Sequence, residues 1–119
     1  MKKILLADDS AIVRNLLKTT LVPYYELIEA KDGKQAVELA GIHAIDLFLL
    51  DLNMPIMDGL DATRQIRTIP KYVKTPILML TSEIKDDKKQ EGKEAGATGW
   101  VSKTVDQKDF LSAINSLLK

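Results

Sequence analysis

The sequence has 119 residues, 45% of them hydrophobic, which is long enough for one complete core and too short for a second domain of ordinary size. Lys and Arg together number 17, as do Asp and Glu, so the zero net charge offers no reason to expect nucleic acid or an anionic membrane as partner. Without cysteine there is no disulfide or thiolate metal site, and the first apolar run is too short for a signal peptide. We expect one cytoplasmic domain over residues 1–119, with no output domain.

Five short strand-like segments alternate with helical patterns along the chain. The third is a run of bulky apolar residues bounded by turn residues, which is typical of a parallel strand buried on both faces. The expected strands cover residues 3–7, 25–30, 45–51, 76–81 and 99–102. Helical patterns begin at Ser10, Gly33, Leu60, Ser82 and Asp106.

Apolar side chains at helical spacing indicate which faces of the helices pack on the sheet. The residues expected to face inward are Ile12, Val13, Leu16, Leu17 and Leu21 in the first helix, and Phe110, Ala113, Ile114 and Leu117 in the last. The fourth helix, expected over residues 82–95, has no large apolar residue between Ile84 and Ala95. It also contains Gly92, which costs about 1 kcal/mol relative to alanine inside a helix. We expect it to be the least stable helix.

Strands that alternate with helices predict an α/β fold, in which right-handed crossovers cover both faces of a parallel sheet. A common doubly wound order for five strands is 2-1-3-4-5. In that order the first and third strands are neighbours, which brings Asp8 and Asp9 beside Asp51 at the carboxyl edge. Thr81 and Lys103 lie at the ends of the next two strands. We therefore expect these polar side chains to meet in one crevice.

Three carboxylates in one crevice repel one another unless a cation lies between them. Oxygen ligands without histidine or cysteine favour Mg²⁺ or another hard divalent ion. A lysine and a threonine beside such an ion are suited to bind phosphoryl oxygens, and a carboxylate can act as the nucleophile. Taken singly, Asp8 and Asp9 would serve as well to stabilise the positive end of a helix. Their convergence with Asp51 favours the phosphoryl site.

Several motifs combine with this pattern. They are Asp8-Asp9, Leu-Leu-Asp-Leu-Asn-Met-Pro-Ile-Met-Asp-Gly at 49–59, Thr-Ser at 81–82, Ala-Gly-Ala at 95–97, and Lys103. Together they resemble the receiver domain of two-component response regulators over essentially the whole chain. The resemblance implies a flavodoxin-like fold and a phosphoryl-accepting signalling switch in a two-component or chemotaxis pathway.

The resemblance also implies roles for the residues around the central aspartate. Asp51 would accept a phosphoryl group from a histidine kinase, a phosphotransfer protein or a small phosphodonor. Asp9, Asp51 and the backbone carbonyl of Asn53 would bind Mg²⁺ directly, and Asp8 would act through water. The implied protein is a monomeric regulatory protein, not an enzyme, although it assists its own phosphorylation and dephosphorylation.

Two further residues would bind the phosphoryl group, and a third would report it. Thr81 would hydrogen-bond one phosphoryl oxygen and Lys103 would neutralise another. Thr81 and Trp100 would act as the switch, which a downstream protein reads at the fourth helix, fifth strand and fifth helix. Trp100 taken alone would more simply be a large residue packed on a strand.

The sequence departs from the receiver pattern at two positions. Thr104 stands where proline, joined by a cis peptide, usually follows the lysine. We expect the bond to be trans here, because a cis bond without proline costs about 2.5–4 kcal/mol. Trp100 stands where receivers usually carry tyrosine, phenylalanine or histidine, which bears on how far the switch residue moves.

Two other functions share parts of the pattern. A phosphatase of the haloacid dehalogenase type also uses an aspartate nucleophile, Mg²⁺, threonine and lysine. It places a second aspartate two residues after the nucleophile as general acid, where this chain has Asn53. A flavodoxin-like electron carrier would need a first turn that accepts a flavin phosphate, and the acids Asp8 and Asp9 would repel it.

Overall fold

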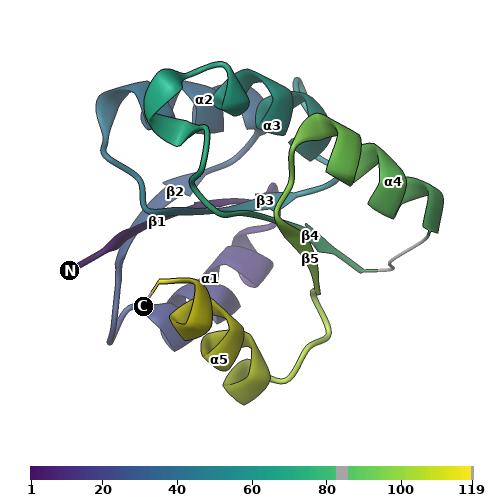
Figure 1. The fold of residues 1–119 in the computed structure, drawn as a ribbon. Coiled ribbons are helices and arrows are strands. Elements are labelled where there is room, and N and C mark those ends of the chain that lie inside the picture. The colour runs from purple at the N-terminus through teal and green to yellow at the C-terminus, as the bar shows by residue number, and fades with distance from the viewer. Residues whose placement is uncertain (83–85, 119) are drawn as a thin grey trace.

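A parallel sheet crosses the middle of the molecule (Figure 1). The computed structural model describes residues 1–82 and 86–118. Within them the sheet has five strands in the order β2-β1-β3-β4-β5, as expected from the sequence. The strands are β1 (Lys3–Ala7), β2 (Glu26–Ala30), β3 (Leu47–Asp51), β4 (Ile77–Thr81) and β5 (Gly99–Ser102). All neighbours pair in parallel, so the carboxyl ends of the strands share one edge.

Helices cover both faces of this sheet. They are α1 (Ala11–Leu21), α2 (Gly33–Ile42), α3 (Gly59–Arg67), α4 (Asp86–Ala95) and α5 (Gln107–Leu117), with the short 3₁₀ turn η1 (Pro70–Tyr72) after α3. Figure 1 shows α2, α3 and α4 on one face and α1 with α5 on the other. The expected α/β doubly wound architecture is confirmed.

Short polar side chains begin three helices at the carboxyl edge of the sheet. Ser10, Asp32 and Asp58 each accept a hydrogen bond from the backbone N–H three residues later. Such caps satisfy an N–H that a helix leaves without a partner in its first turn. They therefore fix where the chain turns away from the strand ends that surround the crevice.

The two faces of the sheet bury separate cores. Phe48 and Leu50 of β3 belong to the core beneath α2 and α3, whereas Leu47 and Leu49 belong to the core that α1 and α5 cover. Every residue of β3 is buried, which includes Asp51. A strand covered on both faces has no polar alternation, and this explains the unbroken apolar run that ends at the aspartate.

The expected inward face of α1 is partly wrong. Leu17 and Leu21 are buried and Val13 is partly buried, but Ile12 is 82% exposed and Leu16 is 48% exposed. Two neighbouring apolar stripes run along this helix, one through Val13, Leu17 and Leu21 and the other through Ile12 and Leu16. The sheet contacts the first stripe only, because one side of a helix fits against it.

A similar correction applies to α5. Phe110 and Ile114 are buried as expected, whereas Ala113 is exposed and Leu117 is 36% exposed. Leu118, which lies just beyond the end of the helix, is buried in their place. The chain leaves the regular helix at this residue, so helical spacing does not predict which side chain turns inward.

Most expected boundaries hold to within two residues. The strand expected from residue 45 begins at Leu47, and α2 continues past Gly41 to Ile42. The fourth helix is described from Asp86, and its expected beginning over residues 83–85, which includes Ile84, lies outside the described residues. Among the residues of α4 whose burial is described, 87–95, only Gly92 and Ala95 are buried, in keeping with the polar sequence of this helix.

Candidate functional site

The polar residues expected in the crevice lie at the carboxyl edge of the sheet. Asp51 ends β3 and Thr81 ends β4, while Asp8 and Lys103 directly follow β1 and β5. Ala7 pairs with Leu50, so the aspartates that follow these two residues lie side by side. Asp8, Asp51 and Thr81 are 0%, 4% and 5% exposed. Such burial is uncommon for carboxylates and requires partners.

Lys103 is the partner that joins the two buried carboxylates. Its Nζ lies 2.9 Å from Oδ2 of Asp8 and 3.0 Å from Oδ1 of Asp51. The lysine side chain is only 18% exposed, so water screens these contacts weakly. One ammonium faces two buried negative charges, and the site retains an excess of negative charge.

Asp8 has one oxygen engaged by the backbone and one available to a cation. Its Oδ1 accepts a hydrogen bond of 2.9 Å from the backbone N–H of Ser10, and its backbone carbonyl accepts one of 2.5 Å from Arg14 Nη1. Oδ2 is fully buried and makes no hydrogen bond of good geometry within the described residues. Its contact with Lys103 is therefore ionic, with lone-pair capacity left over.

A third carboxylate completes an acidic cluster. Carboxylate oxygens of Asp8, Asp9 and Asp51 lie within 4.8 Å of one another, and Asp9 is exposed to solvent. Oxygen ligands at this spacing suit a hard divalent cation, which would also use the spare oxygen of Asp8. The residues present therefore fit Mg²⁺, with an open side at Asp9.

Burial changes the protonation chemistry of the crevice. It raises the pKa of Asp51 from 3.8 to about 6; the hydrogen bond from Lys103 opposes this, and the charge of Asp8 adds to it. Burial alone would lower the pKa of Lys103, but the close contacts of its ammonium with Asp8 and Asp51 and the negative charges of both outweigh the burial, so that pKa is raised. Lys103 is thus held in its charged form, while the raised pKa of Asp51 means that it takes a proton at a higher pH than an ordinary aspartate does.

The loop after Asp51 packs tightly against the strand ends. A Cβ on Gly59 would lie 2.3 Å from the backbone oxygen of Asp51 and 2.5 Å from Cε of Met79, so only glycine fits there. The N–H of Asn53 reaches back to Oδ1 of Asp51 at 3.4 Å. This close approach fixes the direction of the Asp51 carboxylate and places Asn53, whose carbonyl is an expected ligand, beside it.

The two expected switch residues share one face of the sheet. Thr81 pairs with Ser102 and Met79 pairs with Trp100, so Thr81 and Trp100 are diagonal neighbours across β4 and β5. Trp100 is partly buried and packs on the core beneath α2 and α3. Because the two residues are neighbours, a movement of Thr81 can change the position of the Trp100 indole.

The turn after Lys103 has its own hydrogen bonds where receivers usually carry proline. The Lys103–Thr104 bond is trans, as expected. Ser102 Oγ accepts the backbone N–H of Thr104 at 3.2 Å, and the two hydroxyl oxygens lie 2.7 Å apart. These contacts and the contact of Arg14 with Asp8 were not expected from the sequence. Single hydroxyl or arginine residues do not form a sequence motif that would predict them.

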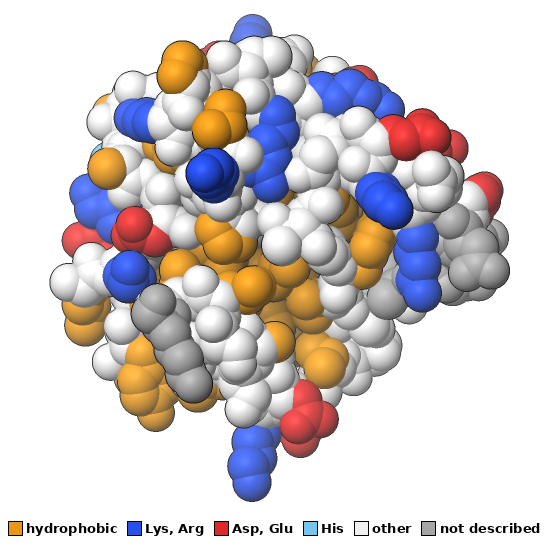
Figure 2. All heavy atoms as spheres, in the orientation of Figure 1, with side chains coloured by type: hydrophobic (Ala, Val, Ile, Leu, Met, Phe, Trp, Pro, Cys, Tyr) orange, Lys and Arg blue, Asp and Glu red, His pale blue; other side chains and the backbone are white. Residues whose placement is uncertain are grey.

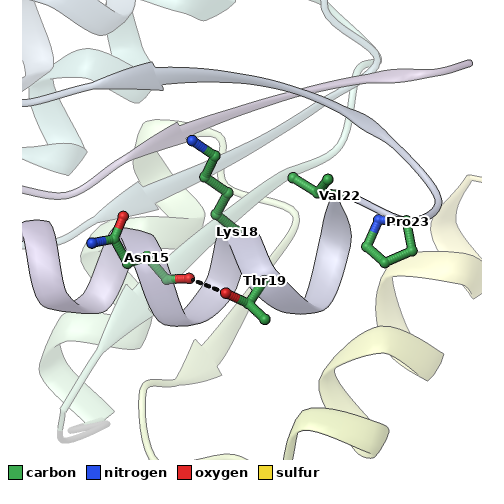
Figure 3. Close-up of a pocket in the computed structure, with 5 residues that line it drawn as sticks. All are labelled: Asn15, Lys18, Thr19, Val22 and Pro23. Carbon is green, nitrogen blue, oxygen red and sulfur yellow. Dashed lines mark hydrogen bonds between the residues drawn. The ribbon is translucent and has the colours of Figure 1, made fainter.

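A separate hollow lies on α1 and does not include the acidic residues. Its volume is about 430 Å³, and it is lined by Asn15, Lys18, Thr19, Val22 and Pro23 (Figure 3). The hydroxyl of Thr19 donates to the backbone oxygen of Asn15 at 2.8 Å, one turn earlier. None of these lining residues carries a carboxylate.

Residues 4–115 match the sequence profile of the response regulator receiver domain. The chain belongs to this family. It is 36% identical to the chemotaxis protein CheY of Halobacterium salinarum over 98% of this chain and 97% of that protein. The transcriptional regulatory protein PdtaR of Mycobacterium tuberculosis is also 36% identical over 95% of this chain, which spans only 55% of the length of PdtaR.

The fold agrees equally well with solved receiver structures. The chemotaxis protein CheY4 of Vibrio cholerae superposes with a TM-score of 0.94 and is 39% identical, and the match covers 99% of both chains. The expected function as a phosphoryl-accepting signalling domain is thereby confirmed, and nothing favours the phosphatase or the flavin carrier. Within residues 1–82 and 86–118, no helix has the length and apolar character that a bilayer span requires.

Proposed function

We propose that Asp51 is the phosphoryl acceptor of this receiver and that the protein acts as a regulatory switch, not as a turnover enzyme. The observation that supports this most strongly is the Lys103 ammonium, 3.0 Å from Asp51 and 2.9 Å from Asp8, in a crevice where both of these carboxylates are buried. A buried carboxylate beside a largely shielded ammonium is suited to carry a phosphoryl group, whose negative charge the ammonium offsets in part.

We propose Mg²⁺ as the cofactor of this site. Asp9, Asp51 and the backbone carbonyl of Asn53 would hold it directly, with Asp8 one water away, in keeping with the cluster of oxygens within 4.8 Å. When bound, Mg²⁺ would neutralise both the carboxylates and the phosphoryl oxygens.

The protein residues then supply position and charge. The carboxylate of Asp51, deprotonated and oriented by Lys103 and the Asn53 N–H, forms a bond to phosphorus. The bond from phosphorus to the donor breaks, and the donor departs with that electron pair. Transfer of this kind demands alignment and charge neutralisation more than covalent chemistry. Lys103 and the hydroxyl of Thr81 would then contact the new phosphoryl oxygens.

The proposed partners are a histidine kinase or phosphotransfer protein upstream and a protein target downstream. Similarity to CheY proteins over nearly their full length supports a chemotaxis or two-component role. The target would read the face made by α4, β5 and α5. Figure 2 shows hydrophobic side chains reaching the surface in the middle of this view, in the band between α4 above and α5 below. We propose that the protein works as a monomer without binding nucleic acid or membrane.

The fluorescence of Trp100, the only tryptophan, tests the switch. An acyl phosphate with Mg²⁺ should change its emission in wild type and leave it unchanged in Asp51→Asn. In Thr81→Ala, phosphorylation should still be visible by intact mass, while the emission change shrinks. A full emission response in Thr81→Ala would refute the coupling through Thr81, and a response in Asp51→Asn would refute the acceptor.

A further inference from the structure

The indole of Trp100 rests on α4 at a place where the helix has no side chain. A Cβ on Gly92 would lie 2.6 Å from Cζ2, 3.0 Å from Cε2 and 3.2 Å from Nε1 of Trp100. Separations below 3.0 Å are essentially never found for a real Cβ. The edge of the indole therefore occupies the space that any other residue at position 92 would fill.

Neither helix formation nor backbone conformation accounts for this glycine. Gly92 lies inside α4, where glycine is less favourable than alanine. Its backbone is helical, whereas Gly96, just beyond the helix, has a φ of +105° that favours glycine. The remaining reason is space, since Gly92 is buried beneath the indole.

The residues around the contact between Trp100 and Gly92 lie along one edge of α4. Trp100 lines a surface groove of about 330 Å³ together with Lys89 and Lys93, which flank Gly92 on the helix. Both lysines are exposed, and neither takes part in an ion pair within the described residues. Within residues 1–82 and 86–118 no acidic group is found bonded to the indole, and the contact that places it is the one with the helix at Gly92.

We infer that Gly92 is a positioning residue for Trp100, forming a notch that seats the indole against α4 in the resting protein. The bulk of the tryptophan side chain fits at this contact because Gly92 has no side chain. Because Trp100 is a diagonal neighbour of Thr81, movement of the indole towards Thr81 would lift it from the notch and release α4. That last step rests on the proposed function, whereas the notch itself does not.

A double-mutant cycle on the unphosphorylated protein tests the notch. Gly92→Ala should lower the melting temperature of wild type, because the added methyl meets the indole. In a Trp100→Ala background the same change should raise the melting temperature, by about 4 °C, because only the gain in helix propensity remains. The same sign in both backgrounds would overturn the inference.

Gly41→Ala is the matched control, because Gly41 lies in α2 and a methyl group added there would have no neighbouring atom within 4 Å. It should raise the melting temperature in both backgrounds equally. Fluorescence provides a second measurement if Trp100→Ala fails to fold. Gly92→Ala should shift the emission of Trp100 to longer wavelength and steepen its quenching by acrylamide, whereas Gly41→Ala should do neither. Emission and quenching identical to wild type in Gly92→Ala would overturn the inference.

The consequence for signalling is tested separately. With an acyl phosphate and Mg²⁺, Gly92→Ala should gain the mass of a phosphoryl group like wild type, but its emission change should be smaller, because the indole has already left its seat. If wild type gains no mass, the proposed acceptor fails while the thermal cycle still decides the notch. A full wild-type emission change in Gly92→Ala would overturn the link between the notch and the switch.

Discussion

Asp51 combines burial with a chemical task that requires its charge. Its carboxylate is 4% exposed, and its pKa is raised to about 6 although Lys103 lies 3.0 Å away. Loss of hydration thus outweighs the nearby positive charge. Because a protonated carboxyl is a poor nucleophile, a cation bound beside Asp51 would favour the charged form that can accept a phosphoryl group.

The raised pKa predicts how stability depends on pH in the metal-free protein. Between pH 3.8 and about 6 the folded state binds more protons at Asp51 than the unfolded state does. The contribution of this group to the free energy of unfolding is therefore complete below pH 3.8 and is lost as pH rises through about 6. The loss is roughly 3 kcal/mol at most, from about 1.4 kcal/mol per pKa unit.

Chemical denaturation in EDTA across this pH range measures the effect. Asp51→Asn cannot titrate, so its free energy of unfolding should fall less than that of wild type as pH rises. Asp109→Asn, a change of an exposed acid on α5, should follow wild type. Parallel pH curves for Asp51→Asn and wild type would contradict the raised pKa.

Ile56 shows backbone strain beside the site. Its φ is 70°, a value that β-branched residues rarely adopt, and its side chain is 78% exposed. The left-handed region costs about 1–2 kcal/mol for ordinary residues, and asparagine tolerates it better. Ile56→Asn should therefore raise the free energy of unfolding by about 1 kcal/mol, as measured by urea denaturation. A destabilised variant would show that the exposed isoleucine makes contacts that outweigh its strain.

The helices differ in how well their packing follows from the pattern of apolar residues. On α1, Leu17 is buried in the core beneath the sheet, whereas Ile12 is 82% exposed. Ile12→Ala should change the free energy of unfolding by less than about 0.5 kcal/mol, as for most exposed sites. Leu17→Ala should cost about 2–4 kcal/mol, because it removes buried methyl groups and leaves a cavity. Equal costs for the two variants in urea denaturation would contradict the observed orientation of α1.

The strands and the crevice were predictable because their signals are local in the sequence. Each buried strand is an apolar run that stops at a polar residue, and Asp51 marks the end of the central one. Parallel strands align those ends at one edge, so the meeting of Asp8 and Asp51 follows from the strand order. Lys103 follows β5, which is not a neighbour of β1 or β3, and its long side chain reaches both carboxylates.

Other features depend on how elements pack, and the sequence pattern does not contain them. Helical spacing allows both apolar stripes of α1 to face inward, and only contact with the sheet selects between Ile12 and Leu17. From the sequence, Gly92 is only a residue that disfavours helix formation, and its contact with the indole of Trp100 becomes apparent only in the structure. The hydroxyl contact between Ser102 and Thr104 likewise depends on the turn that brings them together.

The molecule as a whole should respond to Mg²⁺, because three carboxylates share one edge of the sheet. Bound Mg²⁺ should stabilise the wild-type protein by RT ln(1 + [L]/Kd), which is about 2.7 kcal/mol at a hundred times Kd. Asp9→Asn should raise the melting temperature of the metal-free protein by removing repulsion, and should weaken the response to Mg²⁺. A wild-type melting temperature that is indifferent to Mg²⁺ would contradict the metal site.

The chain belongs to the receiver family, and in its crevice Lys103 lies beside Asp51. We therefore expect a single aspartate, Asp51, to be phosphorylated. The most direct measurement is the intact mass after incubation with Mg²⁺ and an acyl phosphate. Wild type and Asp109→Asn should each gain the mass of a single phosphoryl group, and Asp51→Asn should gain none. The same added mass on Asp51→Asn, formed at the wild-type rate, would contradict the assignment of Asp51 as the acceptor.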